Sequence, residues 1–202
     1  MNSNPIDFYR KEKEYFIAEL SSIKQKLLQS SIIRLLVFGA TAYGIYATID
    51  NTKVLFPVAI IGISSFLYLV SKHTDLQLVK QKVEALIKIN STEIAVLNGD
   101  TTNLPNGEEF INSQHQFSYD IDLFGRNSFF QYINRTATKA GKNLLANFLT
   151  ENKTDIITKK QQAIKELANK PKWRQNFSAT ASLVQTETKP SFIVKILKEY
   201  NS

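Results

Sequence analysis

Two long apolar runs dominate the pattern of hydrophobic and polar positions along the chain. Residues 32–49 contain a single charged side chain, Arg34, and residues 54–70 contain none, with the polar stretch "DNTK" between them. As α-helices the runs would be about 25–27 Å long, close to the roughly 30 Å hydrocarbon core of a bilayer. The sequence therefore predicts a helical hairpin with two membrane spans. Arg34 is near enough to the end of the first span for its side chain to reach the lipid headgroups.

Periodic apolar positions continue on both sides of the two runs, so the helices are expected to be longer than the spans. The positions recur every three, four or seven residues, as on the buried face of a helix, and Asn90 falls in phase with them. Two such stripes would form a short antiparallel coiled coil, or each would pack separately against the following domain. The apolar positions are Tyr9, Phe16, Leu20, Ile23 and Leu27 before the first run and Leu76, Val79, Val83, Leu86 and Leu97 after the second.

The distribution of charge gives the hairpin an expected orientation. Cations gather on the outer flanks of the two runs, whereas the turn between them offers only Lys53 beside Asp50. Because cytoplasmic flanks carry an excess of Lys and Arg, both termini are expected in the cytoplasm, with the inner membrane lipid as partner. The alternative is an apolar hairpin buried inside a soluble helical domain. The flanking cations are Lys24, Lys26, Arg34, Lys72, Lys80 and Lys82.

The second half of the chain has a different pattern of apolar and turn-forming residues from the first. Residues 98–114 are rich in turn-forming residues and separate the hairpin, residues 1–97, from a predicted helical domain over 115–202. The fold class is thus predicted to be mainly α, a long N-terminal helical hairpin followed by a small helical domain.

Within 115–202 we expect a short extended piece over 117–125 and then five helices. The first is expected over 128–135 with Asn127 as its cap, and the second and third after the caps Thr138 and Thr154. The last begins near Ser191. The apolar faces expected to point inward are Ala140, Leu144, Leu145, Phe148 and Leu149 in the second helix, Ile156, Ile157, Ile164, Leu167 and Ala168 in the third, and Trp173, Phe177, Ala181 and Val184 in the fourth.

The amino-acid composition excludes several kinds of functional site. The chain has no cysteine and only two histidines, His73 and His115, which excludes disulfides, thiolate metal sites and a histidine-based cluster. A net charge of +7 favours an anionic partner such as lipid headgroups or nucleic acid. Asp120 and Asp122 would face one side of an extended segment but lack a third oxygen ligand, so no catalytic, cofactor or metal residues are predicted.

A polar cluster interrupts the apolar pattern at residues 134–138. The first motif is Asn134, Thr136, Thr138, Gly141, Leu144 and Leu145, and the second is Ile157, Lys160, Gln161, Ala163, Ile164 and Leu167. Together they resemble the start of the core, or lever, domain of MutS-family proteins over roughly residues 115–185. With the apolar hairpin ahead of it, the chain resembles the membrane-associated MutS-related proteins more than the mismatch-repair enzyme.

The cluster fits a structural joint between two helices better than an active site. The hydroxyls of Thr136 and Thr138 are expected to accept from free amides of the next helix, and Gly141 to allow close approach of a neighbouring helix. Arg135 is expected to pair with carbonyls ending the preceding helix or with Asp120 or Asp122.

The resemblance implies an ATPase that this chain does not carry. No Gly-x-x-x-x-Gly-Lys-Ser/Thr loop occurs in the sequence, so ATP and Mg²⁺ are expected only in a downstream domain, and DNA and a homodimer only through the parent protein. The chain would be the N-terminal part of such a protein, or a degenerate relative.

The predicted function is a non-catalytic membrane-anchoring and lever segment of a MutS-related, DNA-repair-type ATPase. The alternative is a soluble nucleic-acid-binding module whose apolar hairpin is a protein interface. In that alternative Lys172 and Arg174 would contact phosphates.

Overall fold

The computed structural model describes residues 4–151, 153 and 156–184, of which 75% are helical and none forms a strand. Its contacts divide the chain into two compact units, Met1–Ile94 (unit 1) and Ala95–Ser202 (unit 2). The helices within the described residues are α1 Pro5–Ala47, α2 Thr52–Leu97, the 3₁₀ turn η1 Glu108–Phe110, α3 Phe129–Ile133, α4 Lys139–Thr150, α5 Ile157–Ala168 and α6 Pro171–Leu183.

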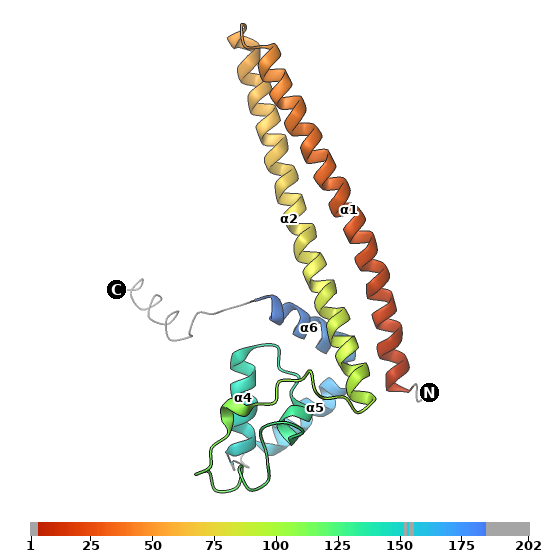
Figure 1. Cartoon of the computed structure of the whole chain (residues 1–202), viewed down its shortest axis with the longest axis vertical. Coiled ribbons are helices and arrows are strands. Elements are labelled where there is room, and N and C mark those ends of the chain that lie inside the picture. Colours follow the sequence, from red (N-terminus) through yellow and green to blue (C-terminus); the bar gives the residue numbers. More distant parts are fainter. Residues whose placement is uncertain (1–3, 152, 154–155, 185–202) are drawn as a thin grey trace, which may run out of the picture. The chain divides into compact units, whose positions relative to one another are not determined.

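In unit 1, α1 and α2 lie side by side and run in opposite directions (Figure 1). The helices are 43 and 46 residues long, so each extends well beyond its apolar run, as the periodicity predicted. The ring centroids of Phe38 and Phe66 are 6.2 Å apart. A Cβ atom at Gly62 would lie 2.3 Å from Thr41 Cγ2, so only glycine permits this approach of the two backbones.

The residues buried in the two long helices fall on the predicted stripes. They are Ile23 in α1 and Val83, Leu86 and Asn90 in α2. Asn90 is fully buried and its side-chain amide donates to the Leu86 carbonyl at 2.8 Å. Val79 and Leu97 of the predicted stripe in α2 are exposed, so the periodicity of these flanks is used for burial only in part. Asn90 meets the requirement that a buried amide be hydrogen-bonded.

Unit 2 is built around a small aromatic core. Leu123, Phe124, Phe130 and Ala146 are buried together, and the rings of Phe110, Phe124 and Phe130 pack with centroids 5.2–5.6 Å apart. Partly buried side chains of Phe117, Leu145 and Leu149 close the cluster.

Residues 98–114, referred to as the connector, contact this core at Gly107. The residue has a φ of 73°, and a Cβ atom there would lie 2.6 Å from the Phe130 ring. A glycine is needed at this position for both reasons.

The extended piece predicted over 117–125 is wrong. Residues 113–122 form successive turns, with Ile121 N donating to Phe117 O at 3.2 Å and Leu123 N to Ser118 O at 3.0 Å. Asp122 has a φ of 47°, in the left-handed region. Asp120 and Asp122 are therefore not alternate residues of a strand, and the geometric reason for pairing them is lost. The turn brings Leu123 and Phe124 into the core, which a local pattern does not record.

Helix starts in unit 2 were predicted with mixed success. Thr138 caps α4 as expected, its hydroxyl accepting from Gly141 N at 3.1 Å. The cap of α3 is Ser128 and not Asn127, which has a φ of 57° and lies before the helix. α3 also ends at Ile133, two residues earlier than predicted. Thr154 and the helix expected from Ser191 lie outside the described residues.

The inward faces predicted for α5 and α6 are wrong. Ile157, Ile164, Trp173 and Phe177 expose 50%, 67%, 54% and 60% of their surface, and α6 buries Gln175 and Ala179 instead. In α4, Leu145 and Leu149 pack on the core as expected, but Leu144 and Phe148 are exposed. Periodicity identifies residues that share a face of a helix; whether another element covers that face depends on the tertiary structure.

Phe130 and its neighbour Phe129 provide a matched test of the core of unit 2. Phe130 is fully buried and Phe129 is 57% exposed. We expect Phe130→Ala to lower the free energy of opening of α3 and α4 by about 3–5 kcal/mol, because it leaves a cavity among the rings. Phe129→Ala should change it by less than about 0.5 kcal/mol. Amide hydrogen exchange on the full chain in detergent micelles measures both, and equal effects would contradict the assignment of the core.

Candidate membrane anchor and polar joint

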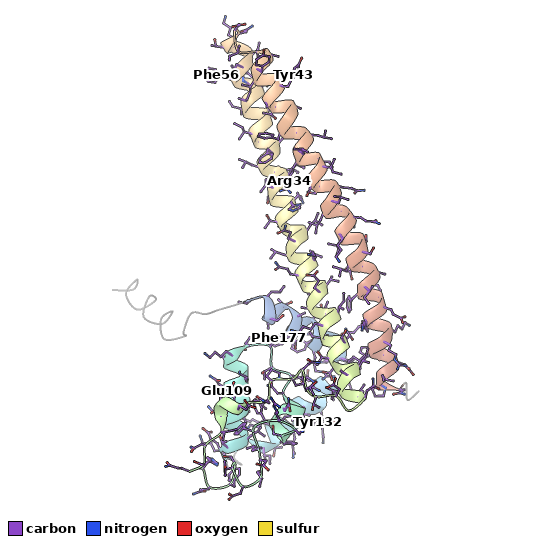
Figure 2. All side chains as sticks on the ribbon, in the orientation of Figure 1. Arg34, Tyr43, Phe56, Glu109, Tyr132 and Phe177 are labelled. Carbon is purple, nitrogen blue, oxygen red and sulfur yellow. The ribbon has the colours of Figure 1, made fainter. Side chains whose placement is uncertain are left out.

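The apolar runs of α1 and α2 are uncovered. Two helices of the described residues have the length and composition needed to cross a membrane, and none of the most apolar 18-residue window of either is buried. In Figure 2 side chains project from the hairpin on both sides, with Tyr43 and Phe56 near its tip. The large side chains that are more than half exposed include Leu35, Leu36, Phe38, Tyr43, Tyr46, Ile49, Phe56, Ile60, Ile61, Ile63, Leu67 and Tyr68.

This exposure determines which environment the hairpin requires. Full burial of a Leu, Ile or Phe side chain is worth about 1.5–3 kcal/mol, so a dozen left in water would forfeit on the order of 20 kcal/mol. Within unit 1 neither apolar run is covered by the other helix on its outward faces. An apolar solvent or an apolar partner must therefore surround them.

A group of polar side chains lies where the first apolar run begins. Arg34 Nη2 donates to Ser31 Oγ at 3.3 Å, and His73 Nδ1 of α2 lies 3.3 Å from Ser30 Oγ of α1. The second ring nitrogen, Nε2, is 3.1 Å from Gln77 Nε2. The contact between Ser30 and His73 joins the two helices at one level along the hairpin. Arg34 is half-buried and bonds to Ser31, which lies three residues toward the outer flank; the reach of its side chain to the headgroups stays a prediction.

The polar cluster at 134–138 is a joint that holds the connector. Asn134 is 2% exposed and ends α3. Its Oδ1 accepts from Thr136 N at 3.1 Å and from Thr136 Oγ1 at 2.7 Å, while its Nδ2 donates to Pro105 O at 3.4 Å. Thr138 then starts α4. The side chain of Asn134 therefore fixes the turn between α3 and α4 and its distance from residue 105, whereas the prediction assigned the joint to the hydroxyls of Thr136 and Thr138.

Two residues of the joint, Thr136 and Gly141, have other roles than predicted, and Arg135 has one of its two expected partners. Thr136 does not cap the next helix, because its hydroxyl donates to Asn134. The atoms nearest a Cβ at Gly141 belong to Thr138 and Thr136, so the space at Gly141 accommodates the joint itself and not a neighbouring helix. Arg135 Nη1 donates to the carbonyls of Tyr132 at 2.9 Å and Asn134 at 3.1 Å, which confirms the pairing with the end of the preceding helix.

Gln131 completes the joint and was not singled out from the sequence. It is buried, its Nε2 donates to Leu104 O at 2.9 Å and its Oε1 accepts from Asn127 N at 2.7 Å. Gln131 N in turn donates to the hydroxyl of Ser128 at 3.1 Å. The Ser-x-x-Gln spacing of residues 128 and 131 is a capping-box pattern and could have identified both residues.

A surface ion pair links α4 to η1. Lys142 donates to Glu109, and this hydrogen bond holds the pKa of the Glu109 carboxyl below its usual value. The Lys142 ammonium also lies 5.9 Å from the centre of the Phe110 ring. Because both charged groups are partly exposed, the pair adds little stability.

Cations outnumber acids in residues 156–184, which contain α5 and α6. Lys172 and Arg174 are exposed on α6, on either side of Trp173, which stacks on Phe177 with centroids 5.3 Å apart and planes at 10°. Trp173 was expected in the core, and it is on the surface. The single acid of residues 156–184, Glu166, pairs with Lys170, and this hydrogen bond lowers the pKa of Glu166. The cations of this segment are Lys159, Lys160, Lys165, Lys170, Lys172 and Arg174.

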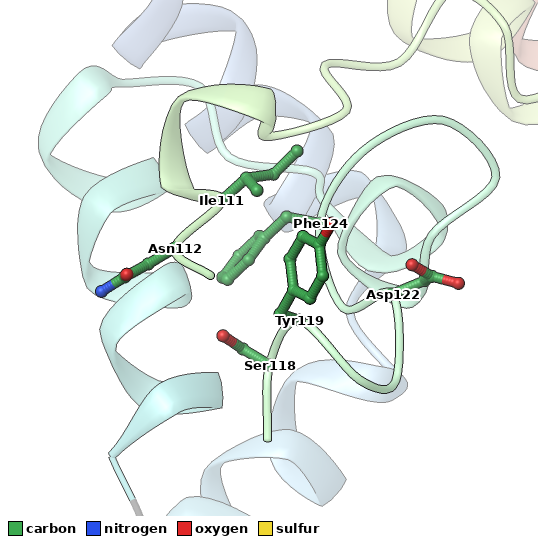
Figure 3. Close-up of a pocket in the computed structure, with 6 residues that line it drawn as sticks. All are labelled: Ile111, Asn112, Ser118, Tyr119, Asp122 and Phe124. Carbon is green, nitrogen blue, oxygen red and sulfur yellow. The ribbon is translucent and has the colours of Figure 1, made fainter. Parts of the chain in front are cut away.

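Unit 2 has a small hollow beside the turns of residues 111–124 (Figure 3), with a volume of about 40 Å³. This is room for about one water molecule. Its lining includes Ser118, Tyr119 and Asp122, and Figure 3 shows the Asp122 carboxylate pointing away from the other lining side chains. Among the described residues no group of three or more His, Cys, Asp or Glu side chains could hold a metal ion. The hollow is therefore much smaller than the clefts of about 300–1,000 Å³ that usually hold small-molecule ligands.

No family model, curated protein or solved structure matches this chain.

The joint makes different predictions for Asn134 and Thr138. Asn134→Ala removes the acceptor of the Thr136 amide and hydroxyl, so we expect a loss of about 1–3 kcal/mol from the opening free energy of α3 and α4. Thr138→Ala should remove about 1 kcal/mol through the lost cap. Asn147→Ala, on the exposed side of α4, is the control and should be near neutral. Amide exchange across residues 129–150 of the full chain gives the three values. A loss for Asn134→Ala no larger than that of the control would contradict the structural role of the joint.

Proposed function

We propose that the chain anchors a protein to a membrane through the hairpin of α1 and α2. The observation that carries the proposal is that the apolar windows of both helices are unburied among the described residues. Every interior backbone amide of a helix is satisfied within the helix, so the two runs can enter hydrocarbon without unpaired polar groups. The helices extend beyond the apolar runs and would stand outside the bilayer on one side.

The proposed orientation places both termini in the cytoplasm, at the inner membrane. Its support is the cationic flanks of the two runs, set against the single lysine of the turn. Unit 2 would then be held on the cytoplasmic side.

An arginine in the second span provides the test of anchoring. Ile61 lies near the middle of residues 54–70 and is 67% exposed, so Ile61→Arg should make insertion less favourable by about 2.5–3.5 kcal/mol. The matched control is Leu78→Arg, at a 53% exposed apolar position of the same helix beyond the span. We expect the wild-type chain and Leu78→Arg to stay in carbonate-washed membranes and the fraction of Ile61→Arg retained there to fall. Recovery of the wild-type chain from the soluble fraction without detergent would overturn the proposal.

A finer proposal concerns what the anchor holds. We propose that unit 2 is the start of the lever of a MutS-related ATPase whose nucleotide-binding domain lies in the parent protein. The support is the two-part motif of residues 134–145 and 157–167, in which the polar residues of the first part form the joint between α3 and α4. In this role the segment transmits movement and has no catalytic residues of its own.

Nucleic-acid binding is a second candidate, favoured by the surface of α5 and α6. Six cations and one acid lie in residues 156–184, and Trp173, which lies between Lys172 and Arg174 in the sequence, is exposed and stacks on Phe177. Cations contact phosphates and an exposed indole can stack on a base.

This second candidate predicts a salt-dependent interaction with duplex DNA. If Lys172 and Arg174 each neutralise one phosphate, their joint replacement by Gln should reduce the slope of log K against log salt by about two. Arg10→Gln with Lys11→Gln, two exposed cations of α1, is the control and should leave the slope unchanged. Fluorescence anisotropy of labelled duplex DNA with the detergent-solubilised full chain measures the slopes. Absence of binding at low salt would exclude this candidate.

A further inference from the structure

Five residues form a layer across the hairpin, referred to below as the boundary layer: Ser30, Ser31 and Arg34 of α1 and Lys72 and His73 of α2. The contact of 3.3 Å between Ser30 Oγ and His73 Nδ1 fixes the two helices at the same level. Arg34 lies four residues from Ser30 toward the tip of the hairpin, and Lys72 one residue from His73 in the same direction. At 1.5 Å per residue the two cations are therefore within about one helical turn of each other along the hairpin.

Arg34 has more hydrogen-bond donors at this layer than acceptors to receive them. Among the described residues its guanidinium has one hydrogen-bond acceptor, Ser31 Oγ, at 3.3 Å. Its Nε is shielded from solvent and has no hydrogen-bond partner. A guanidinium carries five N–H donors, and a shielded donor of a charged group is unfavourable without an acceptor. Its planar fork is complementary to two oxygens of a phosphate.

Lys72 adds a second cation and marks the same level as a membrane interface. Its ammonium lies 5.9 Å from the centre of the Tyr68 ring, and tyrosine and lysine side chains are both common at the headgroup level of spanning helices. Acidic residues are scarce nearby, since none occurs in residues 20–49 or 54–74 and the nearest on α2 is Asp75. The layer thus has positive charge that the neighbouring sequence does not balance.

We propose that the boundary layer binds the phosphate of an anionic phospholipid, with the Arg34 guanidinium as the fork that holds it and Lys72 as the second cation. The inference rests on the proposed membrane anchor, and it names the lipid class that the anchor would prefer. Basic sites between membrane helices at the cytoplasmic surface select anionic headgroups, because their charge is not offset by a choline or ethanolamine. The nearest carboxylate of the sequence, Asp75, lies three residues from Lys72 on the side away from the apolar run.

Native mass spectrometry of the detergent-solubilised full chain tests the proposal by titration with phosphatidylglycerol and, separately, phosphatidylcholine. We expect tighter binding of phosphatidylglycerol by the wild-type chain. Arg34→Gln and Lys72→Gln should each weaken it by about fivefold, with little change for phosphatidylcholine. Arg34→Lys should restore only part of the loss, because an ammonium keeps the charge without the fork. The matched control is Lys53→Gln, at the far end of the hairpin, which should bind as the wild type does.

The outcomes separate this inference from the anchor on which it rests. Carbonate extraction of the same variants reports anchoring, and far-UV circular dichroism reports helix content; both should be unchanged. If all variants stay in the membrane but Arg34→Gln and Lys72→Gln bind phosphatidylglycerol as the wild type does, or Lys53→Gln loses as much, the lipid site is wrong and the anchor stands. Displacement of phosphatidylglycerol by millimolar inorganic phosphate would show a site for small anions and would also overturn the lipid assignment. Loss of the wild-type chain from the membrane would overturn the anchor itself.

Discussion

Water cannot favourably solvate a pair of helices that present apolar side chains on their outward faces, and the hairpin of α1 and α2 is such a pair. The exposed Leu, Ile, Phe and Tyr side chains between residues 35 and 68 need an apolar medium, while the helical backbone needs nothing from it. Close contact at Gly62 and the ring pair of Phe38 and Phe66 hold α1 against α2 without filling those outward faces. The hairpin is thus internally paired and externally apolar, which is the arrangement that a bilayer stabilises.

Unit 2 is stabilised in a different way from the hairpin, by a few buried rings and by polar side chains that fix turns. Asn134 and Gln131 both reach the connector, at Pro105 and Leu104, and they carry the buried hydrogen bonds of a region with little regular structure. Buried amides of this kind specify one arrangement of the backbone, since each leaves donors or acceptors unpaired in any other. The polar cluster that interrupts the apolar pattern therefore contributes to the folding of the described part of unit 2.

Unit 2 exposes aromatic side chains and cations at its surface. Trp173 and Phe177 stack on each other at the surface of α6, and Lys160 lies 3.7 Å from the centre of the Phe148 ring. Rings paired in this way, or covered by a cation, retain some contact energy while remaining accessible. Together with the excess of cations in residues 156–184, they distinguish this surface from the mixed charges of α1.

The sequence by itself determined the helical class, the position and length of the two apolar runs, the continuation of their helices and the cap at Thr138. These features depend on local periodicity, on the absence of charge over a fixed length, and on a side chain that bonds an amide three residues away. Only the tertiary structure decided that residues 117–122 lie in turns, that His73 meets Ser30 across the hairpin, and that the apolar faces of α5 and α6 are largely exposed. Each of these three features depends on which segment, distant in the sequence, packs next to the residues concerned. The order of apolar and polar residues along the chain does not specify that packing. The Phe124 and Phe130 rings occupy the core of unit 2, and Ile164 and Trp173, although correctly in phase on their helices, remain at its surface.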